Sequence, residues 1–170
     1  MFYYKVFHKN YNHFDFQYQE GLNIDNRPLD NKRDIYKDDN YGFHFSDTES
    51  ISDFFYIGQY ISEIVIPNTV EVYKVNSRYC KSKLASQVII KNKMNLSEVT
   101  TWEWMYEQGI NLNTESAVRW AVSRREFEIL DFLISKIPTI TENYMYLAKA
   151  YQYSCFDDMV IYFERNKCLN

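Results

Sequence analysis

The sequence predicts an α+β protein in which a small β-rich N-terminal domain, residues 1–93, precedes a helical region, residues 94–170. Aromatic and polar residues alternate repeatedly in the first region, which is typical of strands with one buried face. In the second region, residues 114–165 hold two copies of one helix–turn–helix pattern with a period close to 30 residues. The polar segment Lys91-Asn92-Lys93 marks the expected boundary between the two regions.

The N-terminal region carries several strand signals. Residues 1–18 are expected to form two strands joined by a polar turn at residues 10–12, because aromatic side chains alternate with polar ones. Residues 25–40 are polar and of mixed charge, which predicts a long solvated loop. The other expected elements are a short helix capped by Thr48 or Ser50 and ending at Gly58, and strands at residues 41–46, 62–67, 70–75 and 86–90.

The repeated pattern of the helical region consists of two helices. Residues 116–122 predict a first helix with alanines on its apolar face, and residues 127–134 predict a second one, which Lys136 suits in its last turn and Pro138 ends. The same pair recurs at residues 145–163, where Ala150 follows Ala121 at an offset of 29. A fixed period of this kind is typical of stacked helical hairpins.

One further helix is expected before the two copies. It spans residues 97–109, with Ser97 as its cap and Gly109 closing it in the left-handed conformation. Trp102 and Met105 give this helix the apolar face that the second helix of each copy also has.

Three stretches in the order Gln-Gly-Ile-Asn-Leu-Asn, Ala-Val-Arg-Trp-Ala and Phe-Glu-Ile-Leu-Asp-Phe-Leu-Ile span much of this region. In that order they resemble a degenerate ankyrin array that covers about residues 96–166. The Thr-Pro-Leu-His signature is missing, and so is the glycine before most second helices. The resemblance implies an ankyrin-like stack of helical hairpins, while an unrelated small helical bundle remains the alternative.

Four N-terminal stretches carry a second resemblance: Glu20 to Asn23, Gly42 to Phe45, Ile61 to Pro67 and Val70 to Val75. They are similar to the region that precedes the repeats in ankyrin-repeat proteins of amoeba-infecting giant viruses of the mimivirus type. Those proteins often carry many repeats, whereas this chain has room for few. The resemblance implies a viral factor that binds host or virion proteins, in the host cytoplasm or the virion, and it implies no reaction.

The charge distribution restricts the possible partners. The formal net charge is -4, with twelve basic and twelve acidic residues in residues 1–95, and seven basic and eleven acidic in residues 96–170. Neither region has the positive field that phosphate binding needs, so no nucleic-acid partner is expected. No signal peptide or membrane-spanning run is evident. The three cysteines have no paired spacing, which predicts reduced thiols in an intracellular protein: Cys80, Cys155 and Cys168.

Motifs that carry chemistry are scarce. His8, His13 and His44 would be candidate metal ligands together with Asp15 or Asp47, and packed or exposed histidines are the favoured alternative. No phosphate loop, nucleophile elbow or paired-carboxylate motif occurs. The sequence therefore predicts no catalytic residue, no metal and no cofactor.

A second hypothesis is an enzyme of unknown reaction with a site in the N-terminal domain near His44. The neighbouring acidic loop contains Asp34, Asp38 and Asp39, but it lacks the spacing, glycine and closing glutamate of a calcium loop. Basic neighbours would lower the thiol pKa of Cys80, although no histidine is close to it in the sequence.

The favoured hypothesis is a protein–protein interaction module. In ankyrin-like stacks the inner helices and the loops before them face partners, and Trp, Tyr and Arg commonly anchor interfaces. Packing between repeats is an alternative role for Trp120. A structural homo-oligomer that covers the C-terminal end of the stack is a third hypothesis. The predicted partner-binding residues are Asn111, Asn113, Glu115, Arg119, Trp120, Tyr144, Tyr146 and Lys149.

Overall fold

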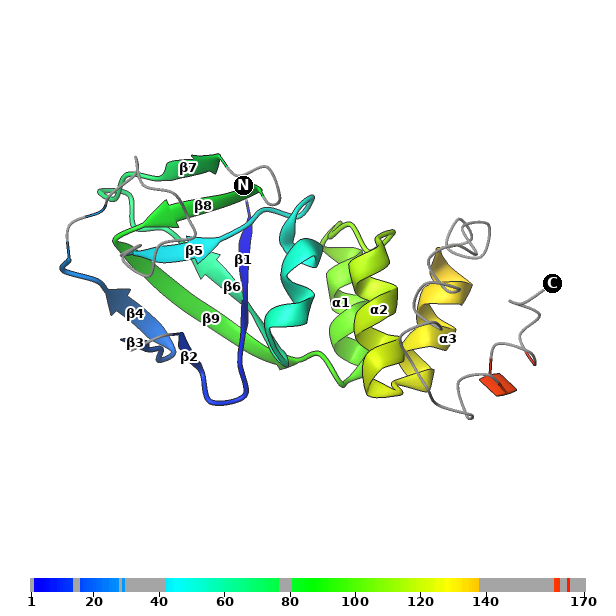
Figure 1. The fold of residues 1–170 in the computed structure, drawn as a ribbon. Coiled ribbons are helices and arrows are strands. Elements are labelled where there is room, and N and C mark those ends of the chain that lie inside the picture. Colours follow the sequence, from blue (N-terminus) through cyan, green and yellow to red (C-terminus); the bar gives the residue numbers. More distant parts are fainter. Residues whose placement is uncertain are drawn as a thin grey trace. The chain divides into compact units, whose positions relative to one another are not determined.

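The computed structural model describes residues 2–13, 16–27, 29, 42–76, 81–137, 161, 162 and 165. The chain divides into two compact units, Met1–Leu96 and Ser97–Asn170. Strands dominate the first unit and helices the second, so the predicted α+β class is confirmed (Figure 1). The second copy of the predicted helical repeat, residues 145–163, lies almost entirely outside the described residues.

Four antiparallel strands form the larger sheet of the N-terminal unit, in the order β1-β6-β9-β4 (Figure 1). Val88 and Ile90 are buried, whereas Lys91 and Lys93 are exposed, which is the two-residue period of a strand with one face in a core. The bounds of these strands are β1 Tyr3–Phe7, β4 Gly21–Ile24, β6 Tyr60–Val65 and β9 Gln87–Asn95.

A second sheet has the order β5-β8-β7, with β5 at Phe43–Phe45, β7 at Tyr73–Asn76 and β8 at Lys81–Ala85. Backbone hydrogen bonds of 2.8 and 2.9 Å between Tyr4 and Ser46 join β1 to the end of β5. On the other side, Ser86 alone separates β8 from β9, so the chain passes directly from one sheet into the other. The two sheets therefore enclose one core.

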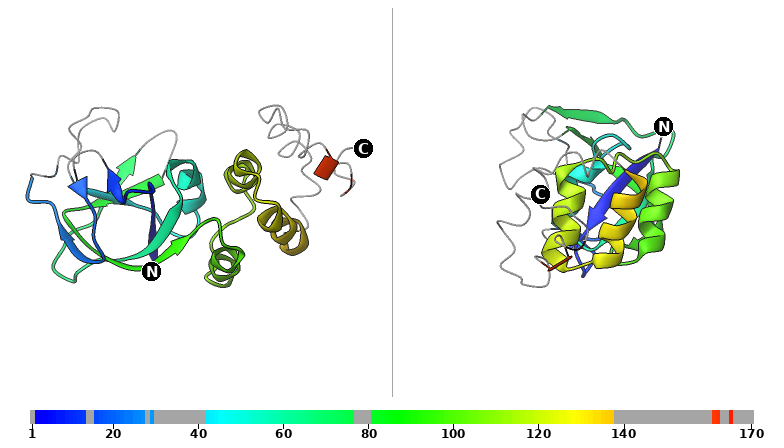
Figure 2. Two further views of the ribbon diagram at one scale, coloured as in Figure 1. Left: turned by 90° about the horizontal axis from the view of Figure 1, so that it is seen from below. Right: turned by 90° about the vertical axis from the view of Figure 1, so that its right-hand side faces the viewer.

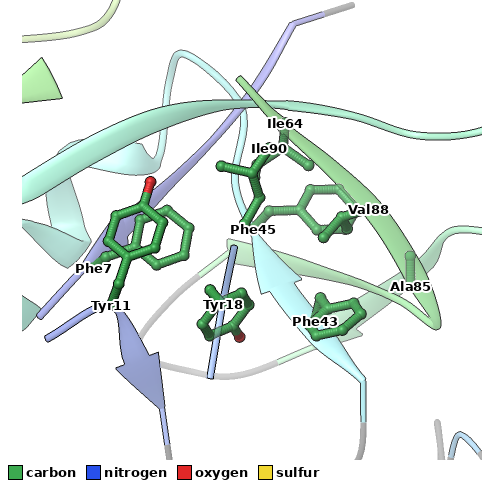
Figure 3. Close-up of a cluster of buried hydrophobic side chains, with 9 residues drawn as sticks. All are labelled: Phe7, Tyr11, Tyr18, Phe43, Phe45, Ile64, Ala85, Val88 and Ile90. Carbon is green, nitrogen blue, oxygen red and sulfur yellow. The ribbon is translucent and has the colours of Figure 1, made fainter. Parts of the chain in front are cut away.

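Aromatic rings fill much of that core (Figure 3). Phe7 stacks on Tyr11 with ring centroids 4.2 Å apart, and Tyr18 meets Phe7 edge to face at 5.0 Å. Such large rings bury about 150–250 Å² each, so a few of them supply most of a small core. The cluster consists of Phe7, Tyr11, Tyr18, Phe43, Phe45, Ile64, Ala85, Val88 and Ile90.

A short 3₁₀ helix, η1, spans Ile51–Ile57 and packs against β1. Its Ile51 and Phe55 side chains are fully buried. Gly58 follows η1, and a Cβ at this position would lie 1.9 Å from the Phe7 carbonyl oxygen. Only glycine lets the chain pass this close to β1. The predicted helix therefore exists, in 3₁₀ form, with Ser50 as its N-cap residue and no side-chain capping bond.

The helical unit contains α1, Val99–Glu107, α2, Glu115–Arg124, and α3, Phe127–Lys136. Helix α3 packs against both α1 and α2, and the right-hand view of Figure 2 shows the three helices side by side. Each helix buries one stripe at helical spacing. The buried residues are Thr101, Trp102 and Met105 in α1, Ala117, Val118, Trp120, Ala121 and Val122 in α2, and Ile129, Leu130, Phe132 and Leu133 in α3.

Helices α1 and α2 end in the same way. Gly109 has a φ of +71°, its N–H donates to Tyr106, and the next N–H donates to Met105 at 3.0 Å. At the end of α2, Arg125 has a φ of +60° and donates to Val122, and the next N–H donates to Ala121. Both ends are Schellman motifs. The left-handed conformation predicted for Gly109 is confirmed, whereas Glu98, not Ser97, is the N-cap residue of α1.

Two strand predictions in the N-terminal unit are wrong, because the strands pair with segments that are distant in the sequence. Strand β1 does not form a hairpin with residues 13–18, since β6 is its partner and β2, Asn12–His13, pairs with β3, Phe16–Gln17. Residues 70–72 lie outside any strand, because β7 begins at Tyr73.

Residues 91–93, the segment expected to mark the boundary, lie within β9, which ends at Asn95. Asn92 adopts a φ of +53° beside a register shift in β6, and its side-chain amide donates to Glu63 at 3.0 Å. Asparagine tolerates the left-handed conformation, so the strand continues through this irregularity. Strand β8 had no clear signal in the sequence.

Candidate interaction surface of the helical unit

The loop before α2 alternates between buried and accessible side chains. Ile110 and Leu112 are buried, while Asn113 is exposed and Asn111 is half-buried. The Asn111 carboxamide oxygen accepts the Asn113 N–H at 3.1 Å, which is a local turn that asparagine favours. Thr114 then caps α2 by accepting the Ala117 N–H at 3.3 Å. The buried side chains of Ile110 and Leu112 therefore anchor the loop, and Asn113 faces the solvent.

The exposed stripe of α2 follows this loop. Glu115, Arg119 and Ser123 succeed one another at intervals of four residues, so they share one side of the helix. The Arg119 guanidinium donates to the Glu115 carboxylate. Ser123 is exposed, and its hydroxyl donates to the Trp120 carbonyl at 3.1 Å. We call Asn113, Glu115, Arg119, Ser123 and Arg124 the α2 surface.

Trp120 lies beneath this surface. It is only 2% exposed, and its ring centroid lies 5.6 Å from that of Trp102 at 49°. The Arg124 guanidinium carbon lies 4.5 Å from the Trp120 ring centroid, a cation–π contact. Trp120 therefore packs within the helical unit and supports Arg124, which was the alternative role considered for it.

The predicted partner-binding residues divide into three groups. Asn113 and Arg119 are exposed, and Asn111 and Glu115 are half-exposed. Trp120 is buried. The remaining three lie outside the described residues: Tyr144, Tyr146 and Lys149. Arg124 was missed as a surface residue, although its position four residues after Trp120 was a usable signal, because helical neighbours at this spacing are in contact.

A segment near the C-terminus reaches α3. The Tyr162 hydroxyl donates to the Asp131 carboxylate at 2.7 Å, and its ring centroid lies 5.3 Å from that of Phe127. Phe127 and Asp131 are four residues apart and therefore share one face of α3. Tyr162 therefore contacts this face of α3.

The histidines do not gather into a metal site in the described part of the chain. His8 is exposed on the segment after β1, and His44 lies half-buried in β5 with its Nδ1 3.5 Å from the Ser82 hydroxyl oxygen. No group of three or more His, Cys, Asp or Glu residues able to hold a metal ion occurs among the described residues.

Two aspartates of the N-terminal unit, Asp25 and Asp47, each form an ion pair and each contact a segment distant in the sequence. The buried Asp25 carboxylate accepts hydrogen bonds from the Arg27 side chain at 2.8 and 2.9 Å and from the Gly42 N–H at 2.8 Å. Burial by itself raises the pKa of Asp25, but these hydrogen bonds outweigh burial and hold the pKa below its usual value. Lys83 donates to Asp47 at 2.6 Å, and the pKa of Asp47 is lowered for the same balance of reasons. Both pairs serve the fold.

Within the part of the chain that the structure describes, no helix is both long and apolar enough to cross a membrane. No protein-family model matches the sequence. No solved structure matches it significantly.

Several proteins of Acanthamoeba polyphaga mimivirus are similar in sequence. The one named "Putative ankyrin repeat protein R229" is 31% identical over 121 residues, which cover 66% of this chain and 38% of that protein. "Putative ankyrin repeat protein R868" is 28% identical over 134 residues, covering 78% of this chain and 66% of that protein. "Uncharacterized protein R869" is 26% identical over 140 residues, covering 78% of this chain and 96% of that protein.

The chain thus spans from 38% to 66% of the length of these two relatives with ankyrin names. At 26–31% identity the relationship is distant. These homologues connect the chain to the mimivirus proteins that are named for ankyrin repeats.

Proposed function

We propose that this chain is a protein–protein interaction module in which a β-rich N-terminal domain is followed in the sequence by a short ankyrin-like stack of helical hairpins, residues 97–170. The observation that carries the proposal is the similarity to proteins named for ankyrin repeats, over 66–78% of this chain. The geometry of α1 to α3 supports it, because two helices end in identical motifs and α3 packs against both others. Repeated units of this kind bury their apolar faces on each other and present the opposite side to partners.

The α2 surface is the best candidate for the binding site. It combines an exposed loop asparagine with a polar stripe along one helix, and buried side chains hold both in place. A surface that is rigid before binding loses less conformational entropy when the complex forms. We therefore place the partner on Asn113, Arg119 and Ser123, and expect Tyr144, Tyr146 and Lys149 to extend the same surface.

The partner is a protein of the host cell or of the virion, by analogy with the viral relatives. An intracellular location follows from the same analogy. Nucleic acid is disfavoured, because residues 97–170 hold eleven acidic and seven basic residues and would repel phosphate.

A binding test needs a substitution that obstructs the surface without loosening the fold. Trp120→Ala is unsuitable, because removing a buried tryptophan costs about 3–5 kcal/mol. Ser123→Tyr adds bulk at the C-terminal end of the exposed stripe and changes no charge. Ser135→Tyr on α3 is a matched control, because Ser135 is also exposed and donates to the carbonyl three residues before it.

Affinity purification of the tagged chain from cells of an amoebal host would compare the two variants with the unchanged protein. We expect Ser123→Tyr to remove a co-purifying protein that Ser135→Tyr retains, with identical circular dichroism for all three. Equal recovery with both variants would refute a binding site on the α2 surface. A stable dimer by light scattering that Ser123→Tyr dissociates would instead assign the surface to a second copy of the chain.

A further inference from the structure

Charge is distributed unevenly over the three described helices. Helix α1 with its flanking residues carries Glu98, Glu103 and Glu107 and no basic residue. In α3, Glu128 and Asp131 outnumber the single Lys136. Helix α2 has the opposite balance, since one acidic residue, Glu115, is opposed by Arg119 and Arg124. A local positive surface on an otherwise acidic unit attracts the negatively charged part of a partner to this one place.

The Arg124 side chain contacts a buried aromatic ring and remains exposed, and one of its N–H groups donates to the Ser123 hydroxyl at 3.4 Å. Its guanidinium lies over the Trp120 ring at 4.5 Å, and Trp120 is fixed by burial and by contact with Trp102. Stacking uses the flat face of a guanidinium and leaves the N–H groups at its edge directed outward. These groups match the two oxygens of a carboxylate. Arg124 is exposed at the end of α2, where a ligand can reach it.

Arg119 already binds a carboxylate within the chain. Its guanidinium donates to Glu115, and 54% of the Arg119 side-chain surface remains exposed in this pair. Arg119 and Arg124 are separated by about 7.5 Å along the helix axis, from the rise of about 1.5 Å per residue. The two side chains also leave the helix about 140° apart around its axis, at about 100° per residue. An acidic segment therefore has to cross α2 to reach both arginines, and carboxylates four residues apart in an extended peptide, about 13 Å, can span them.

From this arrangement we infer that the α2 surface recognises an acidic segment of its protein partner, whose Asp or Glu carboxylates pair with Arg119 and Arg124. The inference rests on the proposed function, because it specifies the chemistry of the partner at that surface. A protein segment is favoured over nucleic acid because the rest of the unit is acidic, and an extended polyphosphate would meet this repulsion along its length.

The test uses the full chain and fluorescein-labelled peptides of about eight residues, which span about 25 Å when extended. One peptide alternates Glu with Ala, one alternates Lys with Ala, and one alternates Gln with Ala. A single-stranded oligonucleotide of similar charge is the fourth probe. Fluorescence anisotropy at about 50 and about 300 mM salt separates electrostatic from other binding. We expect the Glu peptide alone to bind, and to dissociate at the higher salt.

Variants then locate the site. The double substitution Arg119→Glu with Arg124→Glu is expected to weaken Glu-peptide binding by about tenfold or more. Lys136→Glu with Arg165→Glu makes the same change in net charge at two exposed residues elsewhere in the unit and should leave binding unchanged. Glu115→Gln removes the internal competitor for Arg119 and should strengthen binding by about two- to threefold. Arg124→Lys keeps the charge but loses the stacked planar group, so an intermediate loss is expected.

Equal weakening by the two double variants, or tighter binding of the oligonucleotide than of the Glu peptide, would overturn the inference. Absence of Glu-peptide binding would also overturn it, while loss of the cellular partner in Ser123→Tyr would then preserve the proposed function. If Ser123→Tyr retains the partner, the proposed function fails at this surface whatever the peptides do.

Discussion

Lys5 lies in surroundings that disfavour its charge. The side chain is buried in β1, its ammonium nitrogen donates to the His44 carbonyl at 2.8 Å, and it lies 5.2 Å from the centroid of the Tyr18 ring. One neutral carbonyl and a ring face replace only part of the hydration that a free ammonium has. Burial therefore lowers the pKa of Lys5 to about 8. The sequence showed Lys5 only as a polar residue among aromatics and gave no sign of this burial.

Lys5→Met is predicted to stabilise the fold at neutral pH by roughly 1–3 kcal/mol, because methionine fills similar space and has no charge to desolvate. Between the folded pKa of about 8 and the ordinary value of 10.5, the unfolded chain holds a proton that the folded chain has released. The free energy of unfolding of the unchanged protein should therefore rise with pH in this window, and Lys5→Met should lack that rise. Urea denaturation at pH 7 and about pH 9.5 measures both effects.

The ionisation of buried tyrosines limits the pH range in which the unchanged protein and Lys5→Met can be compared. Burial raises the pKa values of Tyr4, Tyr11 and Tyr18 above the ordinary value of 10.0, so the unfolded chain loses these protons first and the free energy of unfolding falls as the pH rises past about 10. The other groups that titrate near neutrality are shared by both proteins and cancel in the difference. A Lys5→Met variant with the same pH dependence as the unchanged protein would show that Lys5 is not buried with a lowered pKa.

At the scale of elements, α1 and α2 end with the same left-handed conformation, but the residue that adopts it is a glycine in one helix and an arginine in the other. Gly109 and Arg125 both have left-handed backbone angles within the same hydrogen-bond pattern. Glycine adopts this conformation without strain, whereas a residue with a Cβ does so at a cost of about 1 kcal/mol. No atom lies within 4 Å of a Cβ built on Gly109, so only the backbone would oppose a substitution there.

Opposite effects are therefore predicted at the two positions. Gly109→Ala should lower the free energy of unfolding by about 1 kcal/mol, and Arg125→Gly should raise it by up to about 1 kcal/mol. Arg125→Ala is the control, because it removes the guanidinium but keeps the Cβ. Chemical denaturation followed by tryptophan fluorescence gives the values. A stabilising Gly109→Ala, or equal effects of Arg125→Ala and Arg125→Gly, would contradict the assigned conformations.

Local signals predicted the described helices well, while pairing between distant segments was not predictable. The apolar spacing around Trp102, Ala121 and Leu130 and the glycine at 109 are properties of neighbouring residues, and they indicated where α1 to α3 lie. The pairing of β1 with β6 joins residues about 60 positions apart, and no local pattern specifies such a partner. The continuation of β9 past residue 91 likewise depends on its neighbour β6.

The candidate surface was predictable in part. Helical spacing allowed Arg119 to be placed on the accessible side of α2, where the structure has it. The same spacing left the position of Trp120 undecided, because a large ring at the edge of an apolar stripe can lie on either side. Its burial depends on Trp102 in another helix, and contact between helices cannot be derived from either one alone.

At the scale of the whole chain, the tryptophans offer a way to observe one unit at a time. Trp102, Trp104 and Trp120 are the three tryptophans, and all belong to the unit Ser97–Asn170. Tryptophan fluorescence therefore follows the helical unit, whereas near-ultraviolet tyrosine signals are weighted toward the first unit. Because each unit has its own core, we predict two denaturation transitions that do not coincide.

Variants sharpen this prediction. Lys5→Met should shift the tyrosine-weighted transition and leave the tryptophan transition in place, and Gly109→Ala should do the reverse. A single transition that both variants shift equally, for every probe, would show that the chain unfolds as one cooperative unit and would contradict the division at residue 96.

A crystal structure of the full chain would show whether residues 97–170 form the proposed stack of like helical hairpins. We expect residues 145–163 to form two antiparallel helices that superpose on α2 and α3 by one translation of about 8–10 Å, with Ala150 in the position of Ala121. A closed bundle, in which no translation relates Ala121 to Ala150, would contradict it.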